Sequence, residues 1–562
     1  MHHCTGLIGL IIIVFQKDRK ATNMKGLVVV AFLLKALLCA SYEVQRTTDL
    51  GLVGGRKIEI LGATIEEYRG IPFAEPPIGE LRFKPPVPAK PWDGTLNATS
   101  RRSGCPQPML NTSLTDNIEY GEDCLHLNVW AREGSSNAPV LVWIYGGGFT
   151  YSSASHDYYT GAVIAAKTGI VVASMNYRLG VLGFLNADSP EAPGNMGLLD
   201  QNLALKWIKN NIDHFGGDPS SITLFGESAG AAGVHAHMLS PMSRGLFRRA
   251  IAMSGVINAP DFTESPHESV AKGDALAAIV GCRPDNKTLV SHPDEVIGCL
   301  RTRSADQLVA ATFRAVPGKH MPFLPTYHNA FLPEEPSVAI RSGSFDTGVD
   351  LLTGVTSDEG VTLFSWLQPK PEILAEHLDN VDRETLINAL HETVSTWMKG
   401  MTPPLLKDDE AENTSKAAIR RKYVDYLSDR LFVCPMHSAA AAHASRGGTV
   451  YTYVFDHWTT KRAPLSWAGV AHAMDLPYIF GLPLLDRERV EFSDEDVAAS
   501  EKHLRIMGAF VGLPVQPGVS AWRKYTAISP ISMLLKNDNN TNIVGFRSDH
   551  CDSSSGHPEM HA

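Results

Sequence analysis

A serine in a glycine-bounded turn is the residue of this chain best suited to nucleophilic chemistry. Ser228 is the centre of the pentapeptide Gly-Glu-Ser-Ala-Gly at 226–230, preceded by the apolar run 221–225 and followed by small residues. This context predicts a short buried strand, a sharp turn and a helix, which together strain the backbone of the serine. The flanking glycines are needed because a larger side chain would collide with the turn. The pattern favours Ser228 as the nucleophile of a hydrolase over the alternative, a glycine-rich turn with an idle serine.

A run of three glycines upstream could supply the hydrogen-bond donors that such a nucleophile requires. A serine hydroxyl needs a base to take its proton, and the developing oxyanion needs preorganised donors. The buried-strand pattern 140–145 leads directly into glycines at 146–148. Glycines in this place leave backbone N–H groups bare, and the N–H of Ala229 would complete an oxyanion hole. A glycine run alone would indicate a flexible turn, but its position ahead of Ser228 favours the functional interpretation.

An acid and then a histidine should follow the serine along the chain, because that is the order in sheets of this kind. Two further strand patterns, 349–354 and 450–455, lead into loops that carry such residues. The first loop holds Asp358 and Glu359, and the second pattern is followed at a distance by His472. Spacing alone selects neither Glu359 over Asp358 nor His472 over other histidines. Those others are His437, His457 and His503.

The elements that must position these residues form one large α/β unit. Strand and helix patterns alternate along the 562 residues without a Pro/Ser-rich linker, an internal repeat or a low-complexity segment. Residues 195–214 show helical periodicity. An apolar fraction of 44% allows a large core, and a charged fraction of 20% is ordinary for a soluble globule. We therefore predict a single domain over 41–562, although length alone would suggest about three.

The net charge of the chain indicates which classes of partner it can bind. The formal net charge is −10 and the isoelectric point is near 6.1. An acidic chain of this kind is repelled by phosphate backbones, so we expect no nucleic-acid partner. We also predict that the chain needs no cofactor and no metal.

Five further motifs stand in a fixed order between about residue 54 and about residue 551. They are Tyr-Arg-Gly-Ile-Pro-Phe-Ala-Glu-Pro-Pro at 68–77, Glu-Asp-Cys-Leu-His-Leu-Asn-Val at 122–129, Asn-Tyr-Arg-Leu-Gly at 176–180, Gly-Asn-Met-Gly-Leu-Leu-Asp-Gln at 194–201 and Phe-Gly-Gly-Asp-Pro at 215–219. With the serine pentapeptide, they resemble the type-B carboxylesterase/cholinesterase family of α/β-hydrolases. The resemblance implies an α/β-hydrolase fold, with a large, mostly parallel central sheet and helices on both faces.

The resemblance resolves the assignments that spacing leaves open. The family's acid is a glutamate in a Ser-Asp-Glu-Gly loop, which matches Glu359, and its base lies in a Gly-Val-x-His segment, which matches His472. It implies that His472 deprotonates Ser228 as the hydroxyl attacks an ester carbonyl, and later protonates the leaving alcohol. Glu359 would fix the imidazole tautomer and stabilise its cation. Water would then hydrolyse the acyl-enzyme.

The same resemblance assigns the oxyanion donors but leaves the role of Glu227 undecided. The donors that match are Gly147, Gly148 and Ala229. Glu227, next to the nucleophile, would either tune the charge beside the histidine or bind an internal water.

Two charged pairs match family positions that form internal ion pairs. They are Arg69 with Glu122, and Arg178 with Asp200. Removing one partner of a buried pair leaves an uncompensated charge at a cost of about 3–5 kcal/mol. We expect these pairs to hold the loops that carry the oxyanion glycines and the first disulfide.

The N-terminus holds two apolar runs, 7–15 and 27–38, separated by a basic stretch. Each is too short to span a bilayer comfortably. The second fits a signal peptide at 24–40, with Met24 as the working start and 1–23 as an upstream extension; a signal anchor is the alternative. Neither an apolar tail nor a lipid-anchor signal follows Cys551, so we expect no stable membrane anchor.

Cysteines and glycosylation sequons favour passage through the secretory route. Eight cysteines, less Cys4 and Cys39, leave an even six, which suits an oxidising compartment. The resemblance implies the pairs Cys105–Cys124, Cys282–Cys299 and Cys434–Cys551. Sequons stand at Asn97, Asn111, Asn286, Asn413 and Asn539. We predict a secreted, extracellular glycoprotein.

The loop between Cys105 and Cys124 bears on the substrate. Cholinesterases hold a quaternary ammonium on a tryptophan of this loop by cation–π attraction. Here the loop contains no tryptophan, and Tyr120 is its one aromatic residue. The segment 319–323, which matches the acyl pocket, is less aromatic than in cholinesterases, and its Met321 favours a roomier pocket. We expect a carboxylesterase that acts on small, neutral, fairly hydrophobic esters rather than on acetylcholine.

Two kinds of alternative remain. This fold also hosts adhesion and binding proteins that lack the serine or the histidine, although this chain retains both. Within the enzyme class, a cholinesterase, a lipase or a hormone esterase would share the same machinery. Glu227 stands where juvenile-hormone esterases commonly carry glutamine, which disfavours that specialised role.

Overall fold

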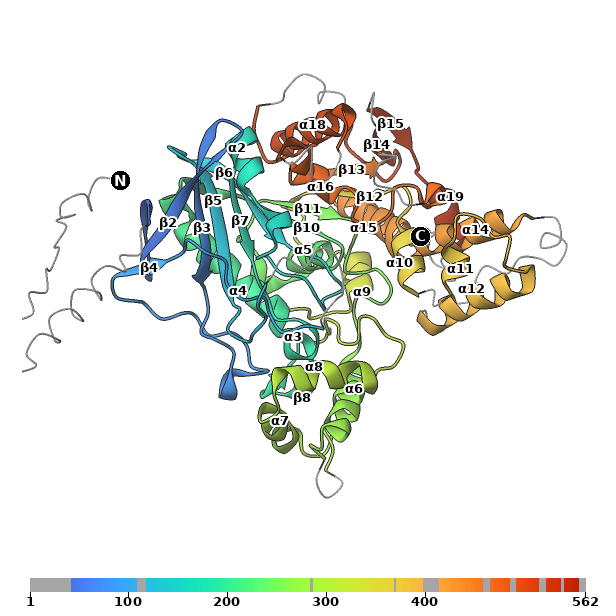
Figure 1. The fold of residues 1–562 in the computed structure, drawn as a ribbon, viewed down its shortest axis with the longest axis horizontal. Coiled ribbons are helices and arrows are strands. Elements are labelled where there is room, and N and C mark those ends of the chain that lie inside the picture. The colour runs from blue at the N-terminus through green and yellow to red at the C-terminus, as the bar shows by residue number, and fades with distance from the viewer. Residues whose placement is uncertain are drawn as a thin grey trace, which may run out of the picture.

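A mixed sheet of 13 strands runs through the described part of the chain (Figure 1). The computed structural model describes residues 42–108, 118–283, 287–367, 370–397, 414–457, 465–485, 492–514, 522–536 and 540–554. The strand order from one edge to the other is β1-β2-β3-β5-β7-β6-β10-β11-β12-β13-β14-β15, and β4 pairs with β2. Neighbouring strands from β7 to β14 are all parallel, whereas both flanks of the sheet are largely antiparallel.

The strands vary widely in length. In chain order they are β1 (Val44–Thr48), β2 (Gly51–Ile60), β3 (Ala63–Pro72), β4 (Thr95–Asn97), β5 (His126–Arg132), β6 (Ala138–Ile144), β7 (Val171–Met175), β10 (Gly217–Glu227), β11 (Arg249–Met253), β12 (Asp350–Thr356), β13 (Val450–Phe455), β14 (Ile531–Leu535) and β15 (Thr541–Val544). A separate small pair consists of β8 (Asn186–Ser189) and β9 (Ala192–Pro193).

Helices cover both faces of the sheet, as the resemblance implied. They are α2 (Ala162–Thr168), α3 (Gly180–Phe184), α4 (Met196–Asn211), α5 (Ala229–Leu239), α6 (Pro266–Ile279), α7 (Pro293–Arg301), α8 (Ala305–Ala315), α9 (Pro336–Ser342), α10 (Gly360–Leu367), α11 (Pro371–Leu374), α12 (Arg383–Trp397), α14 (Lys416–Ser428), α15 (Cys434–Ser445), α16 (Leu476–Ile479), α17 (Leu482–Leu485), α18 (Asp494–Phe510) and α19 (Ser548–Ser554). Three begin with capping boxes, at Ser265, Ser304 and Ser493, in which the cap hydroxyl and a polar side chain three residues on satisfy the first free N–H groups.

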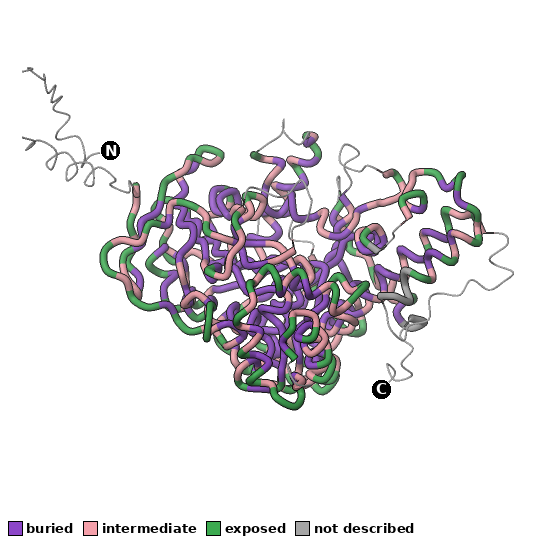
Figure 2. The backbone as a smooth tube through the Cα atoms, turned by 60° about the horizontal axis from the view of Figure 1, so that its bottom comes forward, coloured by how far each residue is buried: buried purple, intermediate pink, exposed green. Residues whose placement is uncertain are grey.

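The central strands are buried over most of their length because helices cover them on both sides. Val140 to Ile144 of β6 are all buried, and so are Thr223 to Glu227 of β10. Figure 2 shows this buried centre in purple, with exposed backbone at the periphery. Two hydrophobic clusters form the core. The larger surrounds the sheet, and the smaller joins α10, α11, α12 and α14 to Val355 and Val454 at the ends of β12 and β13.

The elements predicted around the candidate site are confirmed. The strand patterns at 140–145, 221–225, 349–354 and 450–455 correspond to β6, β10, β12 and β13. The helix predicted over 195–214 forms α4 and then tightens into the 3-10 turn Ile212–Phe215 before a glycine ends it. The mostly parallel sheet between two helical layers is the α/β-hydrolase architecture.

The structure contains the three disulfides that the resemblance implied. Cys105 bonds to Cys124, Cys282 to Cys299, and Cys434 to Cys551. Asn97 is exposed at the end of β4, whereas the other four sequons, at Asn111, Asn286, Asn413 and Asn539, lie outside the described residues. The predicted extension and signal peptide, residues 1–40, also lie outside them. Within the described ranges, no helix has the length and apolarity that crossing a membrane requires.

One of the two predicted ion pairs is present and the other is wrong. Arg178 Nη2 lies 2.7 Å from Asp200 Oδ1, and both side chains are buried. Glu122, however, pairs with Arg82, whose Nη2 lies 2.6 Å from Oε2, and not with Arg69.

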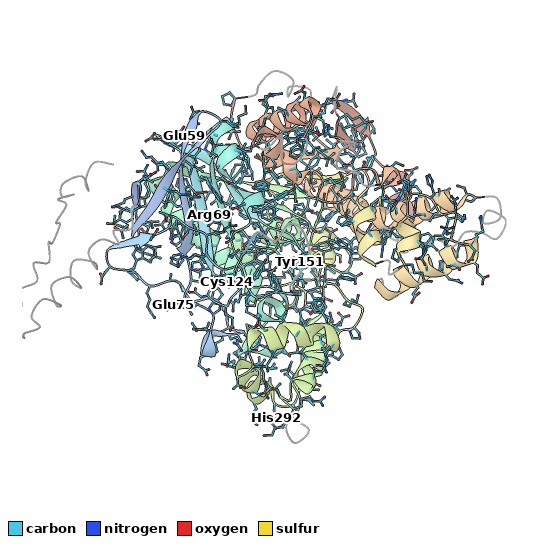
Figure 3. All side chains as sticks on the ribbon, viewed as in Figure 1. Glu59, Arg69, Glu75, Cys124, Tyr151 and His292 are labelled. Carbon is cyan, nitrogen blue, oxygen red and sulfur yellow. A yellow bond between two sulfur atoms is a disulfide. The ribbon has the colours of Figure 1, made fainter. Side chains whose placement is uncertain are left out.

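The chain path explains this correction. Arg69 lies on β3, marked in Figure 3, and its guanidinium contacts Asp157 at 3.3 Å and the Ser155 carbonyl at 3.1 Å. Arg82 follows a 3-10 turn that brings it to Glu122 and to the carbonyl oxygen of Arg301 at 3.0 Å.

Candidate active site

The serine lies in a strained turn between β10 and α5, as predicted. The backbone of Ser228 has φ 58° and ψ −125°, in a region that non-glycine residues rarely adopt. Its N–H donates to the Met253 carbonyl at 2.9 Å. A Cβ on Gly226 would lie 2.6 Å from the Gly230 backbone, and a Cβ on Gly230 would lie 2.1 Å from the Ile144 oxygen. Both glycines of the motif are therefore required by sterics.

Two more glycines lie so close to Ser228 that neither position has room for a side chain. A Cβ on Gly146 would lie 2.9 Å from the Ser228 Cβ, and one on Gly255 would lie 2.3 Å from the Ser228 carbonyl oxygen. Sequence reasoning missed Gly255. The signal that could have found it is the pair Ser254-Gly255 directly after β11, the strand next to β10 in the sheet.

The three-glycine loop turns back on itself and leaves donors bare. The Gly147 carbonyl accepts from the N–H groups of Thr150 at 3.0 Å and Tyr151 at 3.1 Å. Gly147 and Gly148 have φ of 99° and 61°. Within the described residues, their N–H groups donate to no protein acceptor. Ala229 is the first residue of α5, where an N–H has no intrahelical partner. The loop and the helix start thus offer free N–H groups beside the serine.

The structure brings Glu359 and His472 together. His472 Nδ1 lies 2.5 Å from Glu359 Oε2, and the other carboxylate oxygen accepts from the Thr356 N–H at 2.7 Å. Glu359 is fully buried and His472 is 9% exposed. Asp358 instead bonds to the backbone of Val470. The other candidate histidines bind elsewhere: His437 the Phe546 carbonyl, His457 Asp496, and His503 the Ala499 carbonyl.

The second imidazole nitrogen faces Glu227, the residue before the serine. His472 Nε2 lies 3.0 Å from Glu227 Oε1 without forming a hydrogen bond. Within the described residues, no hydrogen bond joins the Ser228 hydroxyl to His472. Active-site hydrogen bonds are often long or misaligned without substrate and tighten in the substrate complex.

The carboxyl groups around His472 raise the pKa of its imidazole. Burial alone would lower the pKa of His472, but Glu227 and Glu359 outweigh it and raise that pKa to about 9. Burial raises the pKa of the Glu227 carboxyl to about 8, against the pull of His472. Burial and Glu359 raise the pKa of Asp475, three residues after the histidine, to about 7. The surroundings therefore favour an imidazolium, the form that a general base reaches when it takes a proton.

Apolar and aromatic side chains lie close to His472 and to the three-glycine loop. The Phe432 ring centroid lies 4.7 Å from that of His472. Met321 covers the three-glycine loop so closely that a Cβ on Gly148 would lie 2.7 Å from the Met321 Cγ. Tyr151, near the middle of the molecule in Figure 3, places its ring 6.1 Å from that of Trp366, which is 48% exposed. Among the described residues, no three His, Cys, Asp or Glu side chains gather at a possible metal site.

Comparisons with known proteins agree with this geometry. The family model described as the carboxylesterase family matches residues 42–553. The chain belongs to the carboxylesterase family. It is 36% identical over 508 residues to an acetylcholinesterase of Bungarus fasciatus, covering 87% of this chain and 82% of that relative. It is 34% identical over 547 residues to an acetylcholinesterase of Leptinotarsa decemlineata, covering 90% and 84%. The protein is therefore a serine carboxylic ester hydrolase, and its substrates are small-molecule esters.

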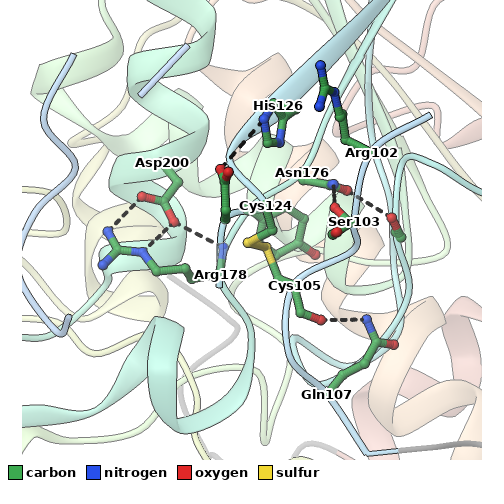
Figure 4. Close-up of a disulfide and its surroundings, with 12 residues drawn as sticks. Arg102, Ser103, Cys105, Gln107, Cys124, His126, Asn176, Arg178 and Asp200 are labelled. Atoms are coloured by element: carbon green, nitrogen blue, oxygen red, sulfur yellow. Dashed lines mark hydrogen bonds and ion pairs between the residues drawn. A yellow bond between two sulfur atoms is a disulfide. The ribbon is translucent and has the colours of Figure 1, made fainter. Parts of the chain in front are cut away.

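In this carboxylesterase, the segment beside the first disulfide, drawn in Figure 4, bonds to the stretch that follows the three glycines. Gln107, two residues after Cys105, donates from Nε2 to the Ser152 carbonyl at 2.9 Å and accepts from the Ser152 N–H at 2.8 Å. The Arg178–Asp200 pair lies close by in the same view, and the N–H of Gly180 donates to the Phe149 carbonyl at 2.7 Å. These contacts support the segment that follows the three glycines.

Proposed function

We propose that Ser228, His472 and Glu359 hydrolyse carboxylic esters through an acyl-enzyme. The observation that carries the proposal is the 2.5 Å contact of His472 Nδ1 with Glu359, formed beside the strained serine turn. Such a bond fixes the imidazole tautomer, so that Nε2 carries the lone pair that a general base needs.

The chemical steps follow from that tautomer. Nε2 of His472 takes the proton of the Ser228 hydroxyl as Oγ attacks the carbonyl carbon, and the carbonyl oxygen becomes an oxyanion. The free N–H groups of Gly147, Gly148 and Ala229 stabilise that oxyanion. When the intermediate collapses, His472 gives its proton to the leaving alcohol. Water then attacks the acyl-enzyme with the same base, which releases the acid and restores the serine.

Glu227 serves to tune the charge at His472 in this proposal. Its Oε1 lies 3.0 Å from Nε2, close enough to stabilise the imidazolium electrostatically. This contact favours charge tuning over the alternative of an internal water site.

Neutral, hydrophobic esters are the proposed substrates. Their support is the apolar and aromatic surface of Phe432 beside His472, of Met321 beside Gly148 and of the Tyr151–Trp366 pair. The disulfide loop lacks the tryptophan that would hold a quaternary ammonium. The two relatives are named acetylcholinesterases, so the ranking of acetylcholine against aryl, triglyceride and terpenoid esters tests this point. Preference for acetylcholine would overturn it.

Secretion completes the proposal. Its support is the signal-like segment 24–40, the three disulfides and the exposed sequon at Asn97. Disulfides of this kind persist in oxidising compartments. Recovery of the protein from the medium of expressing cells, with glycan removable from Asn97, is the expected result.

The test of the catalytic assignment is Ser228→Ala. We expect hydrolysis of short-chain aryl esters to fall about 10³-fold or more, because the nucleophile is lost while the fold is kept. Ser220→Ala, an exposed serine on the same strand β10, is the matched control and should hydrolyse normally. Unchanged hydrolysis by Ser228→Ala would refute the assignment, and an inactive wild-type protein would favour the adhesion alternative.

A further inference from the structure

Asp358, the neighbour of the proposed acid, holds the backbone segment that carries His472. Its Oδ2 accepts from the Val470 N–H at 2.8 Å, and its own N–H donates to the Val470 carbonyl at 3.0 Å. We call these two bonds the Asp358–Val470 clasp. The clasp lies two residues before the histidine and is almost shielded from water, since Asp358 is 8% and Val470 2% exposed.

The histidine segment is shaped to receive this carboxylate. Gly469 has φ 60° and ψ −152°, a conformation open essentially to glycine alone. A Cβ at Gly469 would lie 2.2 Å from Asp358 Oδ2. The missing side chain therefore lets the backbone close onto the carboxylate. Gly469 has a physical reason to be glycine that the motif alone did not provide.

The clasp carries much of the link between the acid loop and the histidine segment. Within the described residues, the other bonds from 356–362 to 469–474 are the Glu359–His472 contact and a 3.4 Å bond from Thr362 Oγ1 to the His472 carbonyl. The Glu359–His472 contact cannot fix its own geometry, and the bond from Thr362 is long at 3.4 Å and therefore weak. The position of the imidazole thus depends on the clasp.

Arg421 on α14 fixes the other oxygen of Asp358. Its Nη1 lies 2.6 Å from Asp358 Oδ1, while its Nη2 lies 2.7 Å from Asp425. Ser357 Oγ also donates to Oδ2 at 2.7 Å. With one oxygen on the guanidinium, the plane of the carboxylate is set and the second oxygen points at Val470.

The ion pairs continue from Arg421 to the C-terminal segment. Asp425 also contacts Arg547 at 2.9 Å, and Arg547 binds Asp429 in the π-helical turn Asp429–Val433. That turn precedes Cys434, which is bonded to Cys551 four residues after Arg547. A line of alternating charges therefore connects a disulfide-anchored end of the chain to the clasp.

We propose that Asp358 is a positioning residue for ester hydrolysis, and that Arg421 orients its carboxylate for that task. The inference rests on the proposed role of His472 as the base. Asp358 does not touch the imidazole; it fixes the backbone from which the imidazole projects. Displacing a reacting group by about 1 Å can cost about 100-fold in rate.

The test compares turnover per active site in single and double variants. Active sites are counted by stoichiometric titration with an organophosphate, so that misfolded molecules do not lower the apparent kcat. We expect Asp358→Ala to lower kcat per site about 10- to 100-fold, with KM within about twofold, because substrate contacts are kept and base geometry is lost. Ser357→Ala is the matched control. It removes a donor to the same oxygen but leaves the clasp, and its kcat should stay within about twofold.

Arg421→Met should lower kcat per site about two- to fivefold, since the pair is partly exposed. In Asp358→Ala/Arg421→Met, the arginine change should add nothing, because it acts through the carboxylate that is already gone. Full additivity of the two changes, or wild-type turnover per site in Asp358→Ala, would overturn the inference.

A second variant of Asp358 tests the inference if the first does not fold, and Ser228→Ala tests the proposed function separately. If Asp358→Ala does not fold, Asp358→Asn keeps the volume and one acceptor, and any fall in its kcat per site should be relieved by Arg421→Met, which removes the donor facing the new amide. No fall in Asp358→Asn, or no relief, would count against the inference. Activity that survives Ser228→Ala would instead refute the proposed function itself.

Discussion

The two sides of the active site are built by different means. The proposed nucleophile side, Ser228 with the glycines at 146–148, stands on the parallel strands β6 and β10 and is shaped by close backbone contacts. The proposed acid–base side, Glu359 and His472, is held by side-chain bonds and by ion pairs that reach into the helices beside it. Close backbone contacts fix the first side, whereas side-chain hydrogen bonds and ion pairs, with one close contact at Gly469, hold the second.

This difference predicts different responses to substitution. A glycine whose neighbour is a backbone atom cannot be replaced without moving a strand, so fold and activity suffer together. A polar side chain that holds its neighbour by hydrogen bonds can be exchanged for a group of the same shape without moving a strand, so activity should change more than stability. Met321 packs against both hydrophobic clusters and lies beside Gly148.

The largest effect on the acid–base side is expected from Glu359→Gln. An amide keeps the shape but stabilises the imidazolium poorly and permits the wrong tautomer, so kcat should fall about 10⁴-fold. The melting temperature should change little by comparison. Steady-state kinetics and calorimetry check both. Retention of more than about a tenth of wild-type kcat would remove Glu359 from the proposed triad.

On the nucleophile side, Gly230→Ala should cost both activity and stability. The new Cβ would lie 2.1 Å from the Ile144 oxygen, which belongs to a central strand and cannot yield. Overpacking of this kind costs about 1–3 kcal/mol, and a displaced nucleophile costs about 100-fold in kcat. Gly298→Ala in α7, where an added Cβ meets nothing, is the control and should not lower the melting temperature. A stable, fully active Gly230→Ala would break the contrast between the two sides.

Met321→Phe should change specificity more than overall activity. A larger, stiffer side chain over Gly148 would narrow the space beside the carbonyl carbon, so kcat/KM for long acyl chains should fall about tenfold relative to acetyl esters. Met321→Ala should shift the same ratio the other way. A series of aryl esters that differ in acyl length measures it. An unchanged ratio in both variants would place the acyl pocket elsewhere.

Glu227→Gln should have the smallest effect, a shift of pH dependence. The proposed mechanism requires neutral His472, and the Glu227 charge raises the pKa of that imidazole. Removing the charge lowers this pKa, so the acidic limb of the kcat/KM profile should move to lower pH by about one unit. A shift to higher pH would contradict the charge-tuning role.

Sequence reasoning succeeded where local patterns are strong. The strands before Ser228 and before the three glycines are apolar runs that end in glycine, and such signals are local. The choice of Glu359 over Asp358 came from family resemblance, because two adjacent carboxylates look alike in a sequence. The structure separates them by partner: one contacts the imidazole and the other the Val470 backbone.

The partner of Glu122 was beyond the sequence. Glu122 finds Arg82 and not Arg69, because a 3-10 turn redirects the chain between the two arginines. Nothing local reveals which arginine a loop will present. The pairing of Asp358 with Arg421 is equally hidden, because Arg421 lies on a helix far along the chain from Asp358.

Covalent labelling tests the central claim most directly. An organophosphate reacts with an activated serine, and peptide mass spectrometry then locates the phosphoryl group. The account predicts a single adduct on Ser228, formed in step with the loss of ester hydrolysis and slowed in Glu359→Gln. An adduct on another residue, or hydrolysis that continues when Ser228 is fully labelled, would contradict it.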